Sequence, residues 1–86
     1  MEAELADYVL CLNECLARTR HAGDRPLYEK YLADAAVLLA LAVRGASSEE
    51  LRSAAAAHGR LLDQTWLEGP EGETVRRAWE HFRSLL

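Results

Sequence analysis

Three short breaks divide this chain into four segments whose apolar residues repeat with the period of an α-helix. The breaks are rich in Gly, Ser or Pro and lie at residues 21–24, 45–48 and 68–70. Between them, apolar side chains recur three and four positions apart, which indicates helices with one buried face. Connections this short force each helix to run back along the one before it. The sequence therefore predicts an all-α fold, a four-helix up-down-up-down bundle that forms a single domain over residues 1–86.

Local signals place the ends of these helices. The expected helices cover residues 3–20, 25–44, 48–67 and, from a start near Pro70 or Glu73, the rest of the chain. Asp24 is the expected N-cap of the second helix, and Gly45 is expected to end it because glycine accepts a left-handed backbone. Ser47 and Glu50 have the spacing of a capping box at the start of the third helix.

Composition and charge exclude several classes of function. The chain has 86 residues and a net charge of −4, from ten basic and fourteen acidic residues. An acidic surface disfavours non-specific binding to nucleic acid and docking on anionic membranes, so neither partner is expected. The longest apolar run, residues 35–43, has about half the length of a membrane span. The acidic start of the chain does not resemble a secretory leader, so a cytoplasmic protein is expected.

The two cysteines, Cys11 and Cys15, lie four residues apart on the first expected helix. Bridging two neighbours on one helix would strain a disulfide, so both are expected to be reduced thiols. As metal ligands they would need His58 and one further group to complete a structural zinc site. No metal or cofactor is therefore expected.

The second segment carries more apolar surface than one face of a bundle needs. After Lys30 its only charged residue before Arg44 is Asp34. The side that should meet water instead carries small apolar residues, namely Ala33, Val37, Ala40 and Val43. A bundle of this size cannot surround one of its own helices, and two-fold dimers are the commonest assembly. These residues predict a homodimer interface. The alternative is that the alanines face water, where they favour helix at no cost.

Two polar residues lie on apolar faces. His58 projects from the centre of the third apolar stripe, and Asp34 lies at the edge of the second. Asp34 needs a donor there, which His58, Tyr8 or an arginine of a second copy could supply. A ligand pocket around His58 would have Tyr31, Asp34 and Cys15 in its wall. The alternative is a core histidine paired with a tyrosine or a backbone carbonyl.

The tryptophans and a basic corner complete the set of candidates. Trp66 and Trp79 belong to apolar stripes, and Trp66 is expected to plug the end of the bundle. The alternative is that Trp66 reaches a surface groove, where tryptophan is a frequent binding hot spot. The basic corner between the first two helices is expected to be solvated; it comprises Arg18, Arg20, His21 and Arg25.

Together these features favour a non-catalytic protein that acts through protein–protein association. It would be a homodimeric adaptor, an accessory protein or an inhibitor of the immunity type, with itself or another protein as partner. This assignment rests on fold-level analogy, since no motif selects a family. The second hypothesis is a small-ligand or metal-binding protein with its site around His58. An enzyme is the weakest interpretation, because no nucleophile accompanies Asp34 and His58, and a thin core leaves little room for a pocket.

Overall fold

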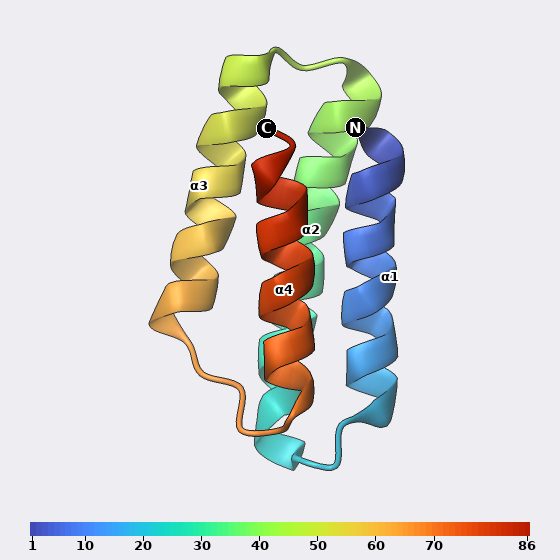
Figure 1. Ribbon diagram of the computed structural model, residues 1–86, viewed down its shortest axis with the longest axis vertical. Helices are drawn as coiled ribbons and strands as arrows, with labels where there is room; N and C mark the ends of the chain where they lie inside the picture. Colours follow the sequence, from blue (N-terminus) through green and yellow to red (C-terminus); the bar gives the residue numbers. More distant parts are fainter.

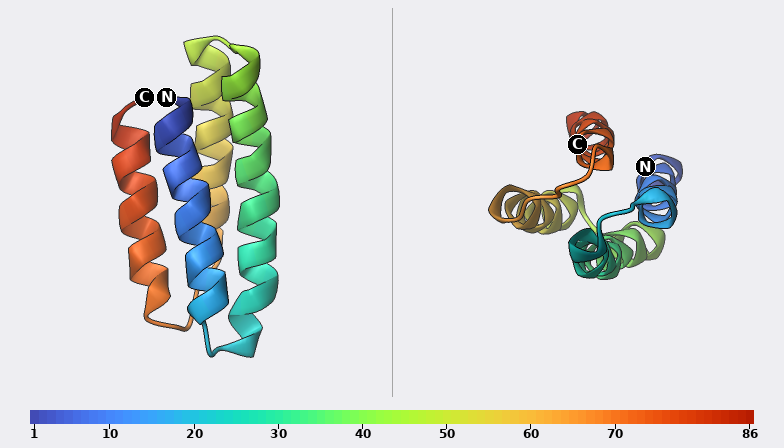
Figure 2. Two further views of the ribbon diagram at one scale, coloured as in Figure 1. Left: turned by 90° about the vertical axis from the view of Figure 1, so that its right-hand side faces the viewer. Right: turned by 90° about the horizontal axis from the view of Figure 1, so that it is seen from below.

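The computed structural model describes residues 1–86 and confirms the four-helix bundle (Figure 1). The helices are α1 (Glu2–Arg18), α2 (Arg25–Arg44), α3 (Ser48–Gln64) and α4 (Glu71–Ser84), and one turn of 3₁₀ helix, η1 (Ala22–Asp24), precedes α2. Successive helices run in opposite directions, and the two chain ends lie side by side at one end of the bundle (Figure 2). The up-down-up-down order follows directly from the short connections.

The four helices stand at the corners of a ring in their chain order, as the end view in Figure 2 shows. Helix α1 packs against α2 and α4, and α2 packs against α3, whereas the contact between α3 and α4 is sparser than these three. Large aromatic side chains fill the space beside this seam, chiefly those of Trp79 and Phe82. A Cβ atom at Gly59 would lie 3.5 Å from Nε1 of Trp79, an ordinary van der Waals distance, so the indole packs directly on α3 at this residue.

The core consists of residues from the four expected apolar stripes. Its buried members are Leu5, Tyr8, Leu12, Cys15, Tyr28, Tyr31, Ala35, Leu38, Ala55, Leu62, Val75, Trp79 and Phe82. The two cysteines are free thiols, as expected from their spacing. Burial and the neighbouring Cys11 raise the pKa of Cys15 to about 12, so this group is an unreactive thiol rather than a thiolate.

The helix ends match the sequence signals at the α2–α3 corner. Gly45 has φ 79° and ends α2 in the left-handed conformation. The hydroxyl of Ser47 accepts a hydrogen bond from the backbone N–H of Glu50 at 3.2 Å, which caps α3. Elsewhere the helices are shorter than expected: α1 ends at Arg18 and α3 at Gln64. Thr65 already has an extended backbone, with φ −124° and ψ 160°.

Asp24 occupies the N-cap position of α2 as expected, but the expectation that its side chain caps the helix is wrong. Asp24 lies in η1 with φ −80° and ψ −23°, and its side chain makes no hydrogen bond to the first turn of α2. A capping residue normally has an extended backbone that aims its side chain at its own helix. The carboxylate of Asp24 instead accepts hydrogen bonds from the backbone N–H groups of Glu68 and Gly69, both at 2.9 Å. This buried carboxylate thus ties the α3–α4 connection to the start of α2.

None of the helices combines the length and the apolar character that crossing a membrane requires.

The first prediction concerns Asp24. Substitution Asp24→Ala removes both acceptors and leaves two N–H groups of the connection without partners. We expect a loss of about 2–3 kcal/mol in the free energy of unfolding, measured by urea denaturation. Asp63→Ala is the control, because Asp63 lies near the same connection but is exposed and forms only a 3.5 Å ion pair with Arg76. It should lose less than about 1 kcal/mol. Equal losses in the two variants would contradict this role for Asp24.

Candidate functional site

A line of three hydrogen-bonded side chains crosses the core and joins three helices. The hydroxyl of Tyr8, on α1, lies 2.6 Å from Nε2 of His58, on α3. Nδ1 of His58 lies 2.6 Å from Oδ2 of Asp34, on α2. The structure thus brings Asp34 and His58 together and also satisfies the histidine through a tyrosine. From the sequence, His58 was one of the candidate partners of Asp34 and, as an alternative, a tyrosine was the candidate partner of His58.

Burial sets the protonation state of this line. It lowers the pKa of His58, while the hydrogen bond and the negative charge of Asp34 act in the opposite direction. Burial also raises the pKa of Tyr8, so its phenol stays protonated. The arrangement that satisfies every atom has the Tyr8 hydroxyl donating to Nε2 and the Nδ1–H group donating to Asp34. His58 is therefore a neutral imidazole with both nitrogens bonded.

Aromatic rings enclose the imidazole of His58. The ring centroid of Trp79 lies 4.6 Å from it, and those of Tyr8 and Tyr31 lie at 5.4 Å and 6.4 Å. His58 is fully buried and Tyr8 is almost so, whereas the Asp34 side chain is 40% exposed. A substrate in solvent could touch only the carboxylate of Asp34. The geometry thus supports a structural connection between helices and supplies no accessible acid–base pair.

The structure does not form the expected pocket from Cys15 and Tyr31 around His58. Cys15 is buried in the core, and Tyr31 lines a cavity at the end of α3. Neither of the two principal cavities has His58, Asp34 or Cys15 in its wall. No three His, Cys, Asp or Glu side chains come together as a metal would require.

The outward side of α2 is uniformly apolar over three turns. Apart from Asp34, whose side chain is 40% exposed, every exposed residue between Tyr31 and Arg44 is Ala or Val. These residues form what we call the outer face of α2: Ala33, Ala36, Val37, Ala40 and Val43. Four of them were singled out from the sequence, and the structure adds Ala36. Val37 and Val43 are 58% and 63% exposed in the single chain.

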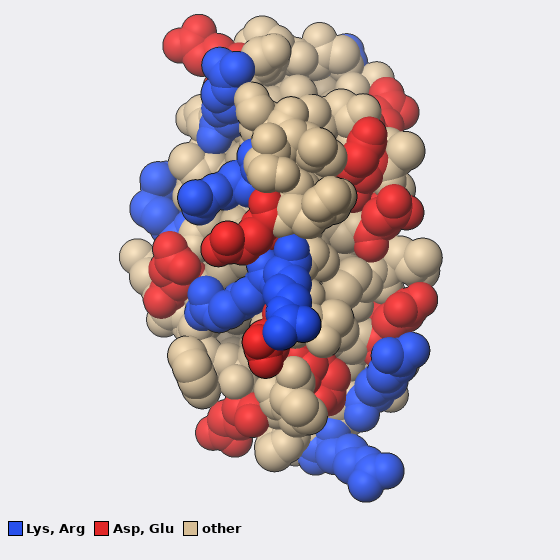
Figure 3. Space-filling view, in the orientation of Figure 1, with Lys and Arg blue, Asp and Glu red and all other residues tan.

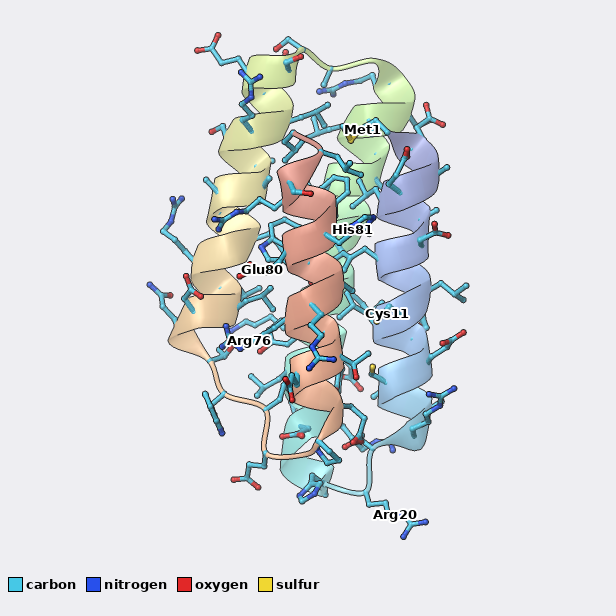
Figure 4. All side chains as sticks on the ribbon, in the orientation of Figure 1. Met1, Cys11, Arg20, Arg76, Glu80 and His81 are labelled. Carbon is cyan, nitrogen blue, oxygen red and sulfur yellow. The ribbon has the colours of Figure 1, made fainter.

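A cavity of about 410 Å³ lies where α3 ends and α4 begins. We call it the α3–α4 cavity. Its walls include Tyr31, Leu62, Thr65, Trp66, Val75 and Arg76. Arg76 projects from α4 towards the end of α3 (Figure 4), and its Nη2 donates to the carbonyl of Leu62 at 3.1 Å. A second cavity, of about 720 Å³, lies between α2 and α3 at the opposite end of the bundle.

The expectation that Trp66 plugs the end of the bundle is wrong, because its side chain is 75% exposed. Helix α3 stops before Trp66, and the extended backbone at Thr65 turns the next residue out of the apolar stripe. Trp66 instead lines the α3–α4 cavity, and the guanidinium of Arg76 lies 5.9 Å from its ring centroid. This is the alternative position for Trp66, at a surface groove. Trp79 is buried in the core, as expected.

Surface charges are distributed without a continuous basic area on the face that Figure 3 shows. Acidic side chains follow the edge over α1, and basic and acidic side chains alternate over α3 and α4. Residues of the basic corner are exposed, and Arg20 projects into solvent below α1 (Figure 4).

No family model, curated protein or solved structure matches this chain.

A matched pair of substitutions tests the role of the Tyr8 hydroxyl. Tyr8→Phe leaves Nε2 of His58 without a donor, so we expect a loss of about 1–2 kcal/mol in unfolding free energy. The control is Tyr28→Phe, because the hydroxyl of Tyr28 is buried and has no hydrogen-bond partner. Its removal should leave stability unchanged or raise it by up to about 1 kcal/mol. Chemical denaturation measures both, and the opposite order would contradict the proposed hydrogen bonds.

A pH dependence follows from the lowered pKa of His58. The unfolded chain takes up a proton near the ordinary value of 6.5, whereas the folded chain takes it up only at lower pH. Protonation of His58 therefore favours unfolding. The free energy of unfolding should keep the whole contribution of His58 above pH 6.5 and lose it progressively as the pH falls below that value. Urea midpoints between about pH 7.5 and about pH 5 measure this. The slope should be shallower in His58→Phe, and an unchanged slope in that variant would rule His58 out as its source.

Proposed function

We propose that this protein is non-catalytic and acts by protein–protein association, with a second copy of itself bound to the outer face of α2. The observation that carries the proposal is that five exposed Ala and Val residues, spaced three and four positions apart, lie on one side of α2. Contiguous apolar surface is a better sign of an interface than scattered apolar residues are. The two free thiols accord with a reducing compartment, and we place the protein in the cytoplasm.

Comparison with α4 supports the choice of α2. Every exposed residue of α4 is polar or charged, as on an ordinary solvated helix. Between Ala33 and Val43, by contrast, the outer face of α2 consists of Ala and Val alone. Small side chains allow two helix axes to approach closely, so a second α2 could pack here without large side chains in the way.

The charges that bracket the face support an antiparallel pairing of two α2 helices. Glu29 lies one turn before Ala33, and Arg44 lies one turn after Ala40, both on the exposed side. When Ala33 of one copy lies opposite Ala40 of the other, Glu29 lies opposite Arg44. A two-fold axis repeats each contact, so the same register yields two ion pairs around an apolar centre. A parallel pairing would oppose like charges.

The size of this face sets the expected affinity. Five small residues per copy form an interface at the lower end of the usual range, which is typical of weak or transient association. We expect dissociation constants in the micromolar range or above. Exchange of partners would then be rapid, which suits an adaptor or accessory protein that also binds other proteins through α2.

The test is the oligomeric state of a charge-bearing variant. Ala40→Glu would bury a carboxylate without a partner in the dimer, so self-association should weaken at least about tenfold. Sedimentation equilibrium over a concentration series measures this. Ala56→Glu is the matched control, because Ala56 is exposed on α3, and it should dimerise like the unaltered chain. An unaltered chain that stays monomeric up to about 1 mM would refute the dimer.

A charge swap tests the antiparallel register. Glu29→Arg should weaken the dimer by roughly twofold to tenfold, because two exposed ion pairs become repulsive. The double variant Glu29→Arg, Arg44→Glu restores opposite charges between copies and should recover most of the affinity. Arg44 also forms a weak 3.7 Å ion pair with Glu50 in its own chain, so single Arg44→Glu is measured alongside. A double variant weaker than either single variant would exclude this register.

A further inference from the structure

The α3–α4 cavity has the size and apolar walls of a site for a small molecule. Its volume of about 410 Å³ falls within the range of ligand pockets, which is about 300–1,000 Å³. Leu62, Leu67 and Val75 contribute apolar wall, and the ring of Tyr31 lines the cavity as well. Such walls select a ligand with an apolar body.

An exposed aromatic ring stands at the cavity. The indole of Trp66 is 75% exposed, and Arg76 lies against its ring without covering it. A side chain of this size left in water can stack on a flat ligand, and its face attracts a positive charge. Arg76 already shows that this ring accepts a cation within the chain itself.

The hydroxyl groups in the wall offer acceptors rather than donors. The hydroxyl of Thr65 donates to the carbonyl of Leu61 at 2.8 Å. Its oxygen is also bonded to the hydroxyl of Tyr31, which must then be the donor in that pair. Both hydrogens are therefore committed, and the Tyr31 oxygen keeps acceptor capacity. A ligand must bring its own N–H or O–H groups to bond there.

Several other donors beside the cavity are committed to partners within the chain. The backbone N–H groups of Glu68 and Gly69 donate to Asp24, and that of Gly72 donates to the carbonyl of Gly69. Arg76 donates to Leu62 and lies 3.5 Å from the carboxylate of Asp63. These particular donors are therefore not available to an anionic ligand.

Net charge in the wall has the sign that suits a cation. Glu68 and Glu73 contribute two carboxylates, and Glu68 forms no ion pair. Glu73 pairs with Arg77 at the surface, 2.7 Å apart. Because Asp63 offsets the charge of Arg76, an acidic excess remains around an apolar and aromatic cavity.

We propose that the α3–α4 cavity binds a small organic cation, an ammonium- or guanidinium-bearing molecule with an apolar or aromatic body. Its body lies against Leu62, Val75 and the ring of Trp66. Its charged group lies towards Glu68 and donates to the oxygen of Tyr31. This site is distinct from the outer face of α2 and does not require the dimer.

Three probes of one shape and different charge test the proposal. Phenethylammonium, phenethyl alcohol and 3-phenylpropionate are titrated separately, and the indole N–H signals of the two tryptophans are followed by NMR. We expect phenethylammonium to shift the Trp66 signal in a saturable manner and to bind at least about threefold more tightly than 3-phenylpropionate. The buried indole of Trp79 is the internal control and should move little. Added salt should weaken the binding of phenethylammonium and leave the binding of phenethyl alcohol unchanged.

Variants locate the binding groups. Glu68→Gln should lower the affinity for phenethylammonium by about twofold to fivefold without changing the affinity for phenethyl alcohol. Trp66→Ala, followed through backbone amide signals of residues 65–73, should weaken it by a similar factor. Glu14→Gln, on the exposed side of α1, is the matched control and should bind like the unaltered chain. Ala40→Glu should also bind normally, which separates this site from the proposed dimer.

Any one of three results would overturn the proposal. The first is that none of the three probes shifts the Trp66 signal saturably, which would leave the cavity without a ligand of this class. The second is that 3-phenylpropionate binds as tightly as phenethylammonium. The third is that Glu68→Gln leaves binding of phenethylammonium unchanged. The second or third result would mean that charge plays no part in recognition at this cavity.

Discussion

A single imidazole, buried and bonded at both nitrogens, joins three of the four helices. His58 is fully buried and receives a hydrogen bond from Tyr8 while donating one to Asp34. A polar group in such a position is tolerated only when its partners are present, because the apolar surroundings make an unpaired nitrogen costly. The pairing therefore requires α1, α2 and α3 to meet in one register. Packing of Trp79 against the same ring brings α4 into that arrangement.

A second buried polar contact determines the shape of the lower end of the bundle. Asp24 holds the backbone of Glu68 and Gly69, so the connection between α3 and α4 crosses the base of the molecule instead of continuing α3. That path takes Trp66 out of the core and leaves the α3–α4 cavity beneath it. The proposed cation site is thus a consequence of how one carboxylate satisfies two distant N–H groups. Substituting Asp24 should disturb the cavity along with the stability of the fold.

The two proposed surfaces differ in the physics of recognition. The outer face of α2 is apolar and uncharged at its centre, so burial of small side chains would drive association there, with Glu29 and Arg44 setting direction. The α3–α4 cavity is concave and combines aromatic walls with an acidic excess, so charge and hydrogen-bond donors would decide which ligand enters. The line of Tyr8, His58 and Asp34 supports both surfaces by holding the helices, and its only exposed group is the carboxylate of Asp34.

Periodicity and corner residues determined the number, order and direction of the helices, because a helix of this length buries one stripe and a short corner reverses the chain. Gly45 and Ser47 ended and began helices as expected, since those signals act within a few residues. The apolar outer side of α2 was also evident from its composition. The roles of Asp24 and Trp66 depended on tertiary structure. Hydrogen bonds to residues more than forty positions away outweighed local capping, and an early end of α3 moved Trp66 off its stripe. Helix packing also decided which of the candidate partners form hydrogen bonds with Asp34 and His58. Sequence spacing defines the face of a helix on which a residue lies, but not the residue that lies opposite it.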